Sequence, residues 1–186
     1  MTRSTFILIL LISVSCAERA PIGEKFATVD RSEIQLDSAL SKKAGIALLF
    51  LSPECPLCQN YSVTIDRIQD SFKNENIAFY GVVSGEYYSE SDIKGFLIRY
   101  KLDLPILLDP KFKLAGYYEA TTTPEVVLIG EDGEELYQGA IDNWAISLGQ
   151  KRLTITEHYL EDALSAHLQG KEINPKKTKA VGCFIE

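Results

Sequence analysis

The first half of the chain alternates continuous apolar runs with a stretch of helical period. Ile46–Leu51 is an apolar run of strand length, as is typical of a strand buried on both faces. A second such run covers Ile77–Val83. Between them the apolar residues recur every three or four positions, as one stripe of a helix: Leu57, Tyr61, Ile65, Ile68 and Phe72. Strand, helix and strand of these lengths predict a right-handed crossover joining two parallel strands.

The second half continues with shorter elements. The pattern predicts a helix capped by Ser89 or Ser91 and covering 93–100, a strand at 105–109, a helix at 111–118, a hairpin of strands 125–129 and 135–139, and a last helix at 156–168. Helices interleaved with parallel strands and followed by a hairpin predict the α/β class with a mixed sheet.

Composition narrows the kind of protein. The chain has 186 residues, of which 46% are hydrophobic and 24% charged. This length suits one domain, and the proportions exclude wholesale disorder and a multi-span membrane protein. The formal net charge is -7, without a long basic stripe, and would repel a phosphate backbone. We therefore expect no nucleic-acid partner.

The N-terminus is typical of a targeting segment. Arg3 is followed by the apolar run Phe6–Ile12 and by small residues before Cys16. Such a run rises about 10 to 14 Å as a helix, against about 30 Å of bilayer hydrocarbon, so it cannot span as an anchor. Residues 1–15 are predicted to be a signal peptide, and the protein to be exported to a periplasm or cell envelope. The ending resembles a bacterial lipoprotein signal, whose Cys becomes the acylated first residue, although Ser13 stands where a larger aliphatic is usual; the alternative is an ordinary signal peptide cut nearby.

The remaining chain divides into a tether at 16–24, a domain at 25–170 and a C-terminal extension at 171–186. The extension begins with a lysine-rich polar linker, but Val181–Ile185 is apolar and is expected to pack against the domain. Cys183 lies in this apolar part. It is either a small buried hydrophobe or a third redox thiol folded back near the other cysteines.

The segment with the clearest chemistry is Ser52–Cys58, between the first strand and the first helix. A Cys at a helix start lies at the positive end of the helix dipole, which favours the thiolate and lowers the pKa below its usual ~8.5. Cys58, one turn after Cys55, can close a disulfide with it. Pro56 suits the first helical turn. Glu54 opposes the dipole, so no extreme pKa is expected for Cys55.

A metal site is the competing interpretation of this pair. Cys-x2-Cys forms half of many zinc sites, but no second pair follows. On the last predicted helix His158 and His167 face opposite sides, so that helix cannot offer both to one ion. We therefore expect no metal and no organic cofactor, while copper(I) binding by the two thiolates stays open as an alternative.

Thr123-Pro124 precedes the strand at 125–129. A Pro entering a strand removes a hydrogen-bond donor and leaves open backbone, on which an extended substrate can pair. The alternative is a Pro that merely begins an edge strand. Two tyrosine pairs, Tyr87-Tyr88 and Tyr117-Tyr118, are candidates for the rim of a substrate surface, although tyrosines in loops and helices are more often ordinary packing.

A strand, a Cys-x-x-Cys at the next helix start and a Thr-Pro before a later strand resemble the thioredoxin fold over about Phe26–Leu168. The elements between Ile77 and Tyr118, with Leu107–Pro110 inside them, are similar to the extended redoxin subgroup. That subgroup is shared by thioredoxin-like periplasmic oxidoreductases and the alkyl hydroperoxide reductase superfamily.

The resemblance implies a three-layer sandwich, with a central mixed sheet and helices on both faces. It also implies roles for single residues: Cys55 as the exposed nucleophile, Cys58 as the resolving thiol and Pro124 as a cis-proline facing the pair. Thr123, Pro56 and Leu57 would contact the substrate.

Departures from the relatives decide among three functions. Thioredoxin has Trp before its first Cys and Gly-Pro inside the pair, where this chain has Glu54 and Pro56-Leu57. The peroxidase branch has Thr or Ser three residues before its Cys, which Ser52 satisfies, and a Pro four residues earlier, where this chain has Leu48. Sco-type copper chaperones have three residues between their cysteines and a His in a late loop. This chain has two residues between its cysteines, and its His158 lies on a predicted helix, which argues against close similarity to them.

The sequence therefore predicts an exported thiol-disulfide oxidoreductase. Its partners would be proteins with dithiols or disulfides, together with a membrane electron donor or acceptor, reached from a lipid anchor on Cys16. A thiol peroxidase and a non-catalytic copper(I)-binding or assembly factor are the alternatives.

Overall fold

The computed structural model describes residues 21–186. The predicted signal peptide at 1–15, the lipidation site Cys16 and the tether up to residue 20 lie outside the described residues. Within 21–186, no helix has the length and apolar character needed to cross a bilayer.

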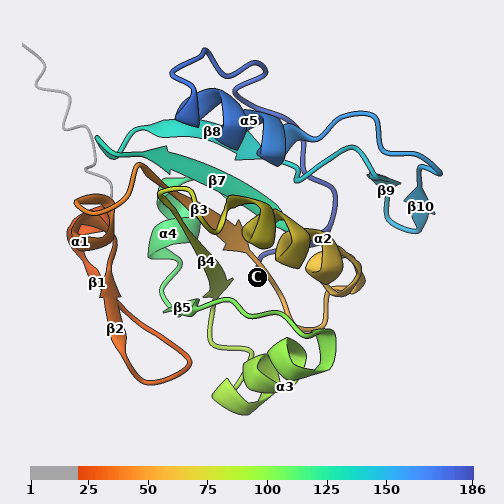
Figure 1. The fold of residues 1–186 in the computed structure, drawn as a ribbon. Helices are drawn as coiled ribbons and strands as arrows, with labels where there is room; N and C mark the ends of the chain where they lie inside the picture. Colours follow the sequence, from red (N-terminus) through yellow and green to blue (C-terminus); the bar gives the residue numbers. More distant parts are fainter. Residues whose placement is uncertain (1–20) are drawn as a thin grey trace, which may run out of the picture.

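A five-stranded mixed sheet forms the centre of the molecule, with strand order β5-β4-β3-β7-β8 (Figure 1). The three strands β3, β4 and β5 are parallel, and β7 and β8 continue the sheet antiparallel. Their bounds are Gly45–Phe50 for β3, Ile77–Ser84 for β4, Ile106–Asp109 for β5, Glu125–Gly130 for β7 and Glu135–Gly139 for β8. The predicted crossover and hairpin are both confirmed.

Helices cover both faces of this sheet (Figure 1). One face packs against α2 (Pro56–Phe72), α3 (Glu90–Tyr100) and α5 (Tyr159–Leu168), and the other against α1 (Leu36–Leu40) and α4 (Lys113–Tyr117). Side chains of β3 alternate between the two cores, with Leu49 on the α2 side and Leu48 on the α4 side, because successive residues of a strand point to opposite faces. The predicted three-layer sandwich is confirmed.

Two predicted helices begin later than the periodicity suggests. Helix α4 starts at Lys113 because Phe112 has left-handed φ and ψ angles of 54° and 31°. The buried carboxylate of Asp109 accepts hydrogen bonds from the backbone N–H groups of Lys113, Leu114 and Ala115. Helix α5 starts at Tyr159 because His158, at φ -111° and ψ 59°, is not helical.

Several very short elements were not predicted. They are the five-residue helix α1, the 3-10 turn η1 (Pro21–Gly23), the hairpin β1 (Lys25–Ala27) with β2 (Glu33–Gln35), the hairpin β9 (Ala145–Ser147) with β10 (Gln150–Lys151), and the pair β6 (Thr122–Thr123) with β11 (Cys183–Phe184). Two or three residues are too few to establish a period, so pattern analysis cannot detect such strands.

The C-terminal segment 171–186 runs back along the domain. Gln138 of β8 donates its N–H to Lys176 and accepts from the N–H of Thr178, at 2.9 Å each. Farther on, β11 pairs with β6, and Ile185 packs against the α4-side core. The predicted packing of the apolar segment Val181–Ile185 is confirmed.

Candidate active site

The two cysteines of the pair stand where the chain leaves β3 and enters α2. Cys55 is the N-cap residue, with extended φ and ψ of -71° and 116°, and Pro56 is the first helical residue. Gln59 donates its N–H to the Cys55 carbonyl at 3.1 Å, which closes the first turn. Cys58 lies in that turn, and both cysteines are free thiols. The predicted location of the pair at a helix start is confirmed.

Cys58 lies in the core. Its side chain has no exposed surface, and its sulfur accepts a hydrogen bond from the backbone N–H of Ser52 at 3.4 Å. Burial raises the pKa of the Cys58 thiol well above its ordinary value. Cys58 therefore remains a protonated thiol and acts as a hydrogen-bond donor toward its neighbour.

The Cys55 sulfur receives hydrogen bonds from two other thiols. Donation from Cys58, and a smaller contribution from Cys183, lower the pKa of Cys55 to about 4 against the opposing effect of burial. The expectation of no extreme pKa was wrong. It considered the helix end and Glu54, whereas the main cause is thiol donors packed around the sulfur. When Cys55 is protonated it donates to the Thr123 carbonyl at 3.1 Å, a contact that favours the thiol form and works against this shift.

Thr123 lies against the pair and is joined to Pro124 by a cis peptide bond. The Thr123 carbonyl contacts Cys55 although the two residues are 68 positions apart in the chain. The structure thus brings together three of the predicted site residues, Cys55, Cys58 and Thr123, and Pro124 follows directly.

The buried carboxylate of Glu125 holds the backbone that leads to Thr123. One oxygen of Glu125 accepts from the N–H groups of Thr121 and Thr122 at 3.2 and 3.3 Å, and the other accepts from the Gln138 side chain at 3.0 Å. Burial raises the pKa of Glu125. Sequence reasoning missed this residue, and the only available signal was an acidic residue at the start of an otherwise apolar strand.

The predicted exposure of Cys55 was wrong. The residue retains 1% of its accessible surface, with Thr123 and Cys183 as neighbours of its sulfur. The two residues between the cysteines differ in environment. Pro56 is exposed, whereas Leu57, the next residue of α2, is buried in the core.

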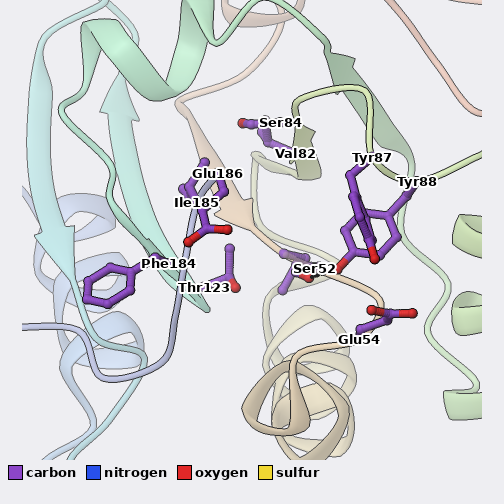
Figure 2. Close-up of a pocket in the computed structure, with 11 residues that line it drawn as sticks. Ser52, Glu54, Val82, Ser84, Tyr87, Tyr88, Thr123, Phe184, Ile185 and Glu186 are labelled. Atoms are coloured by element: carbon purple, nitrogen blue, oxygen red, sulfur yellow. Dashed lines mark hydrogen bonds between the residues drawn. The ribbon is translucent and has the colours of Figure 1, made fainter.

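A cavity of about 410 Å³ is lined by Ser52, Glu54 and Thr123, which are neighbours of the pair in the chain or in space, although neither cysteine lines it (Figure 2). Tyr87 and Tyr88 lie on one side of it, and Phe184, Ile185 and Glu186 of the C-terminal segment lie on the other. Of the two tyrosine pairs that the sequence singled out, Tyr87 and Tyr88 border this cavity, whereas Tyr117 and Tyr118 do not line it.

The hydroxyl of Ser52 is hydrogen-bonded to the Tyr88 hydroxyl at 2.8 Å. The sequence had matched Ser52 to the hydroxyl residue of the peroxidase branch. Here the backbone N–H of Ser52 donates to the Cys58 sulfur, and its hydroxyl is hydrogen-bonded to Tyr88 instead of to a cysteine.

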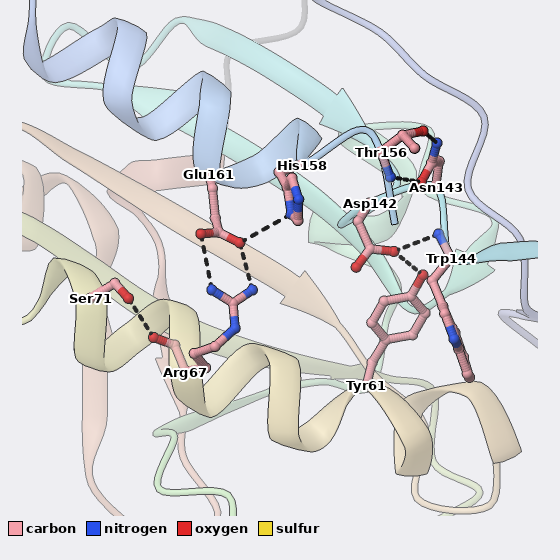
Figure 3. A network of polar contacts seen from close by, with 9 residues as sticks. All are labelled: Tyr61, Arg67, Ser71, Asp142, Asn143, Trp144, Thr156, His158 and Glu161. Atoms are coloured by element: carbon pink, nitrogen blue, oxygen red, sulfur yellow. Dashed lines mark hydrogen bonds and ion pairs between the residues drawn. The ribbon is translucent and has the colours of Figure 1, made fainter. Parts of the chain in front are cut away.

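Polar contacts link α2, the helix that carries the cysteines, to the loop at 142–144 and to α5 (Figure 3). The Tyr61 hydroxyl donates to the buried Asp142 at 2.6 Å, and the same Asp142 oxygen accepts from the N–H of Trp144 at 2.8 Å. One turn and a half farther along α2, Arg67 forms two hydrogen bonds with Glu161 of α5 at 2.6 and 3.1 Å. Sequence reasoning missed Asp142, which lies in a loop without periodicity.

The histidines lie apart from the cysteines. His158 is beside Glu161 at 3.6 Å, and a ring nitrogen of His167 is 2.8 Å from the Ala44 carbonyl. Over residues 21–186, no three or more His, Cys, Asp or Glu side chains are grouped so as to hold a metal ion.

Comparisons with known proteins give a family and a related sequence. The model of the AhpC/TSA family matches residues 19–135. The chain is 23% identical, over 120 residues, to the thiol-disulfide oxidoreductase ResA of Bacillus cereus, covering 63% of this chain and 68% of that protein.

Solved structures share the fold. An uncharacterized conserved protein of Geobacillus kaustophilus has a TM-score of 0.76 at 22% identity, covering 90% of this chain and 93% of that one. A secreted disulfide oxidoreductase of Mycobacterium tuberculosis, described as homologous to DsbE of E. coli, has a TM-score of 0.56 at 17% identity, covering 81% of this chain and 97% of that one.

Proposed function

Because this chain belongs to the AhpC/TSA family, we propose that it is a thiol-disulfide oxidoreductase that exchanges disulfides with client proteins through Cys55 and Cys58. The observation that carries the proposal is the unequal pair at the start of α2. One sulfur has a pKa lowered to about 4 and is a thiolate at neutral pH, while the other remains a buried thiol. Only the thiolate is a strong nucleophile, so the two sulfurs have different tasks.

The reaction follows from this division. The Cys55 thiolate attacks one sulfur of a client disulfide, which forms a mixed disulfide and releases the other client sulfur as a thiolate. Cys58 then attacks the Cys55 sulfur. Its proton passes to the departing client sulfur, and a Cys55–Cys58 disulfide remains. Two electrons have moved from the pair to the client, and the reverse sequence oxidises a client.

The backbone beside the pair suits an extended client. Thr121–Thr123 is held by Glu125 and ends at a proline, and the Thr123 carbonyl lies 3.1 Å from the Cys55 sulfur. A client strand paired with this backbone would bring its own cysteine to Cys55. The direction of electron flow depends on the client, because about 30 mV changes the equilibrium tenfold.

Reduction of insulin disulfides tests the assignment. The Cys55→Ser variant should lose the activity, because a serine hydroxyl is not ionised at neutral pH and cannot form the mixed disulfide. Val63→Ser, at an exposed position of the same helix, is the matched control and should retain it. Retained activity in Cys55→Ser would reject the assignment. Rapid consumption of hydroperoxide by the reduced protein, together with negligible insulin reduction, would favour a peroxidase instead.

We also propose that the protein acts outside the cytoplasm from a lipid anchor on Cys16, with a membrane protein as electron donor or acceptor. The support is the N-terminal order of Arg3, an apolar run too short to span and a Cys at its end. Labelled fatty acid should enter the wild type but not Cys16→Ala in a bacterial host. Trapped mixed disulfides of Cys58→Ala in the native host would identify the clients.

A further inference from the structure

The C-terminal segment covers the backbone on which a client would pair. Strand β11 lies antiparallel to β6, with Cys183 opposite Thr123 and Phe184 opposite Thr122. The N–H of Ile185 then donates to the Thr121 carbonyl at 3.0 Å, and the Thr123 hydroxyl donates to the Cys183 carbonyl at 3.4 Å. Residues 121–123 are therefore engaged along their length by the protein's own tail.

Gly182 makes this close approach possible. A Cβ atom at position 182 would overlap the Thr123 carbonyl, lying 2.6 Å from its carbon, and would also lie 3.0 Å from the Thr122 methyl group. The atoms in the way are mainly backbone, so they cannot turn aside as a flexible side chain would. Any residue other than glycine would push the tail off β6.

The pairing brings a third thiol to the nucleophile. Cys183 is within hydrogen-bonding reach of Cys55 and contributes to the lowered pKa of that residue. Thr123 links the two cysteines, since it is paired with Cys183 across the strands and its carbonyl contacts Cys55. Cys183 thus occupies the position in which a paired client would present its own cysteine.

The C-terminal segment is held at two separate places, at Thr178 and at β11. The Thr178 hydroxyl accepts from the Ala140 N–H at 2.9 Å and is hydrogen-bonded to the Tyr137 hydroxyl at 2.6 Å. Residues 179–182 have no comparable backbone hydrogen bond with the rest of 21–186. Release of β11 alone would uncover Cys55 while the chain stays held at Thr178.

We propose that the tail segment Val181–Glu186 is a tethered mimic of the client, and that its Cys183 exchanges disulfides with Cys55. This inference rests on the function proposed above. In the oxidised protein the Cys183 thiol gives up its proton as its sulfur attacks the Cys55 sulfur, the Cys55–Cys58 bond breaks, and Cys58 leaves and takes up that proton. One disulfide replaces another, so no external oxidant or reductant is consumed.

The residues around Cys183 also predict which client segments would bind in its place. It is extended, has a glycine before its cysteine and has two apolar residues after it. A client competing for the same backbone would be an extended segment with a small residue immediately before the reactive Cys and apolar residues following it. Until such a segment displaces the tail, the nucleophile stays covered.

Mapping of disulfides in Cys58→Ala tests the exchange. Oxidised glutathione should first form a mixed disulfide with Cys55. The Cys183 sulfur should then attack Cys55 and pass its proton to the departing glutathione, which leaves a Cys55–Cys183 disulfide within one chain. Mass spectrometry of the non-reduced peptides identifies both products. Adding Gly182→Ala should lower the yield of the internal disulfide at least about tenfold, the equivalent of about 1.4 kcal/mol.

The matched control is Gly95→Ala, which also adds one methyl group but finds no atom within 4 Å. It should leave the internal disulfide unchanged in the Cys58→Ala background. Equal and persistent glutathionylation of Cys55 with and without Gly182→Ala would overturn the proposal. Should the double variant fail to fold, Cys58→Ala alone decides, since formation of the internal disulfide supports the proposal and its absence overturns it.

A second measurement separates this proposal from the general function. In the otherwise wild-type reduced protein, Gly182→Ala should speed iodoacetamide alkylation of Cys55 at least about tenfold, and Gly95→Ala should not change it. Equal rates in all three proteins would overturn the covering role of the tail. If Gly182→Ala uncovers Cys55 but the protein still does not reduce insulin, the proposed function fails while the docking of the tail stands.

Discussion

Replacing Cys58 by alanine should raise the pKa of Cys55. The Cys58 thiol is the main donor to the Cys55 sulfur, and it acts on the thiolate form only, so its removal destabilises the thiolate. A hydrogen bond to a charged group contributes about 1.5–3 kcal/mol, and one pKa unit corresponds to about 1.4 kcal/mol. The pKa should therefore rise from about 4 by about 1–2 units.

The rate of iodoacetamide alkylation against pH measures this change. The Cys55 peptide is quantified by mass spectrometry in fully reduced protein, so that reaction at Cys183 is counted separately. In the wild type the rate should be nearly constant at neutral pH and fall as the pH drops through about 4. In Cys58→Ala the fall should begin at a higher pH.

Two further variants show whether the donor itself is responsible. Cys58→Ser retains an O–H donor in the same position and should keep the profile near that of the wild type. Cys183→Ala removes the smaller contribution and should shift the profile less than Cys58→Ala does. The reasoning is refuted if Cys58→Ala leaves the profile unchanged, or if Cys58→Ser shifts it as far as Cys58→Ala.

Three predictions concern stability, each measured as the free energy of unfolding in urea. Tyr61→Phe should cost about 1–3 kcal/mol because it leaves the buried carboxylate of Asp142 without its side-chain donor. The same change at Tyr87, which is 77% exposed, should cost less than about 0.5 kcal/mol, and equal costs would contradict the argument. Asp109→Ala should cost about 2–4 kcal/mol because three N–H groups of α4 lose their acceptor. Asp109→Asn keeps one oxygen and should cost less; the reverse order of the two costs would contradict this account of the helix start. Arg67→Ala should cost less than about 1 kcal/mol despite its two hydrogen bonds, because the side chain is half exposed; a loss above about 2 kcal/mol would show that the pair is structural.

The long elements of the fold could be predicted because burial leaves a periodic trace in the sequence. Strand β3 is apolar throughout, since both of its faces are covered, and the stripe of α2 repeats every three or four residues. The location of Cys55 and Cys58 followed from the same pattern, because residues between a buried strand and a helix lie at the helix start. Starts of helices were less predictable. Phe112 and His158 adopt non-helical backbone that no pattern of polarity reports.

The order of apolar and polar residues was thus sufficient to predict the crossover, the hairpin and the presence of a thiol pair at a helix end, since these depend on neighbours within a few turns of chain. The three layers were implied by the resemblance to the thioredoxin fold. Only the tertiary structure decided that Cys55 is covered, that Glu125 supports Thr121 and Thr122, and that Cys183 lies opposite Thr123, 60 residues earlier in the chain. The physical reason is that pairing between strands of two residues depends on a close approach of distant backbone at Gly182. Such an approach depends on the folded path of the whole chain, and no local pattern of residues encodes it.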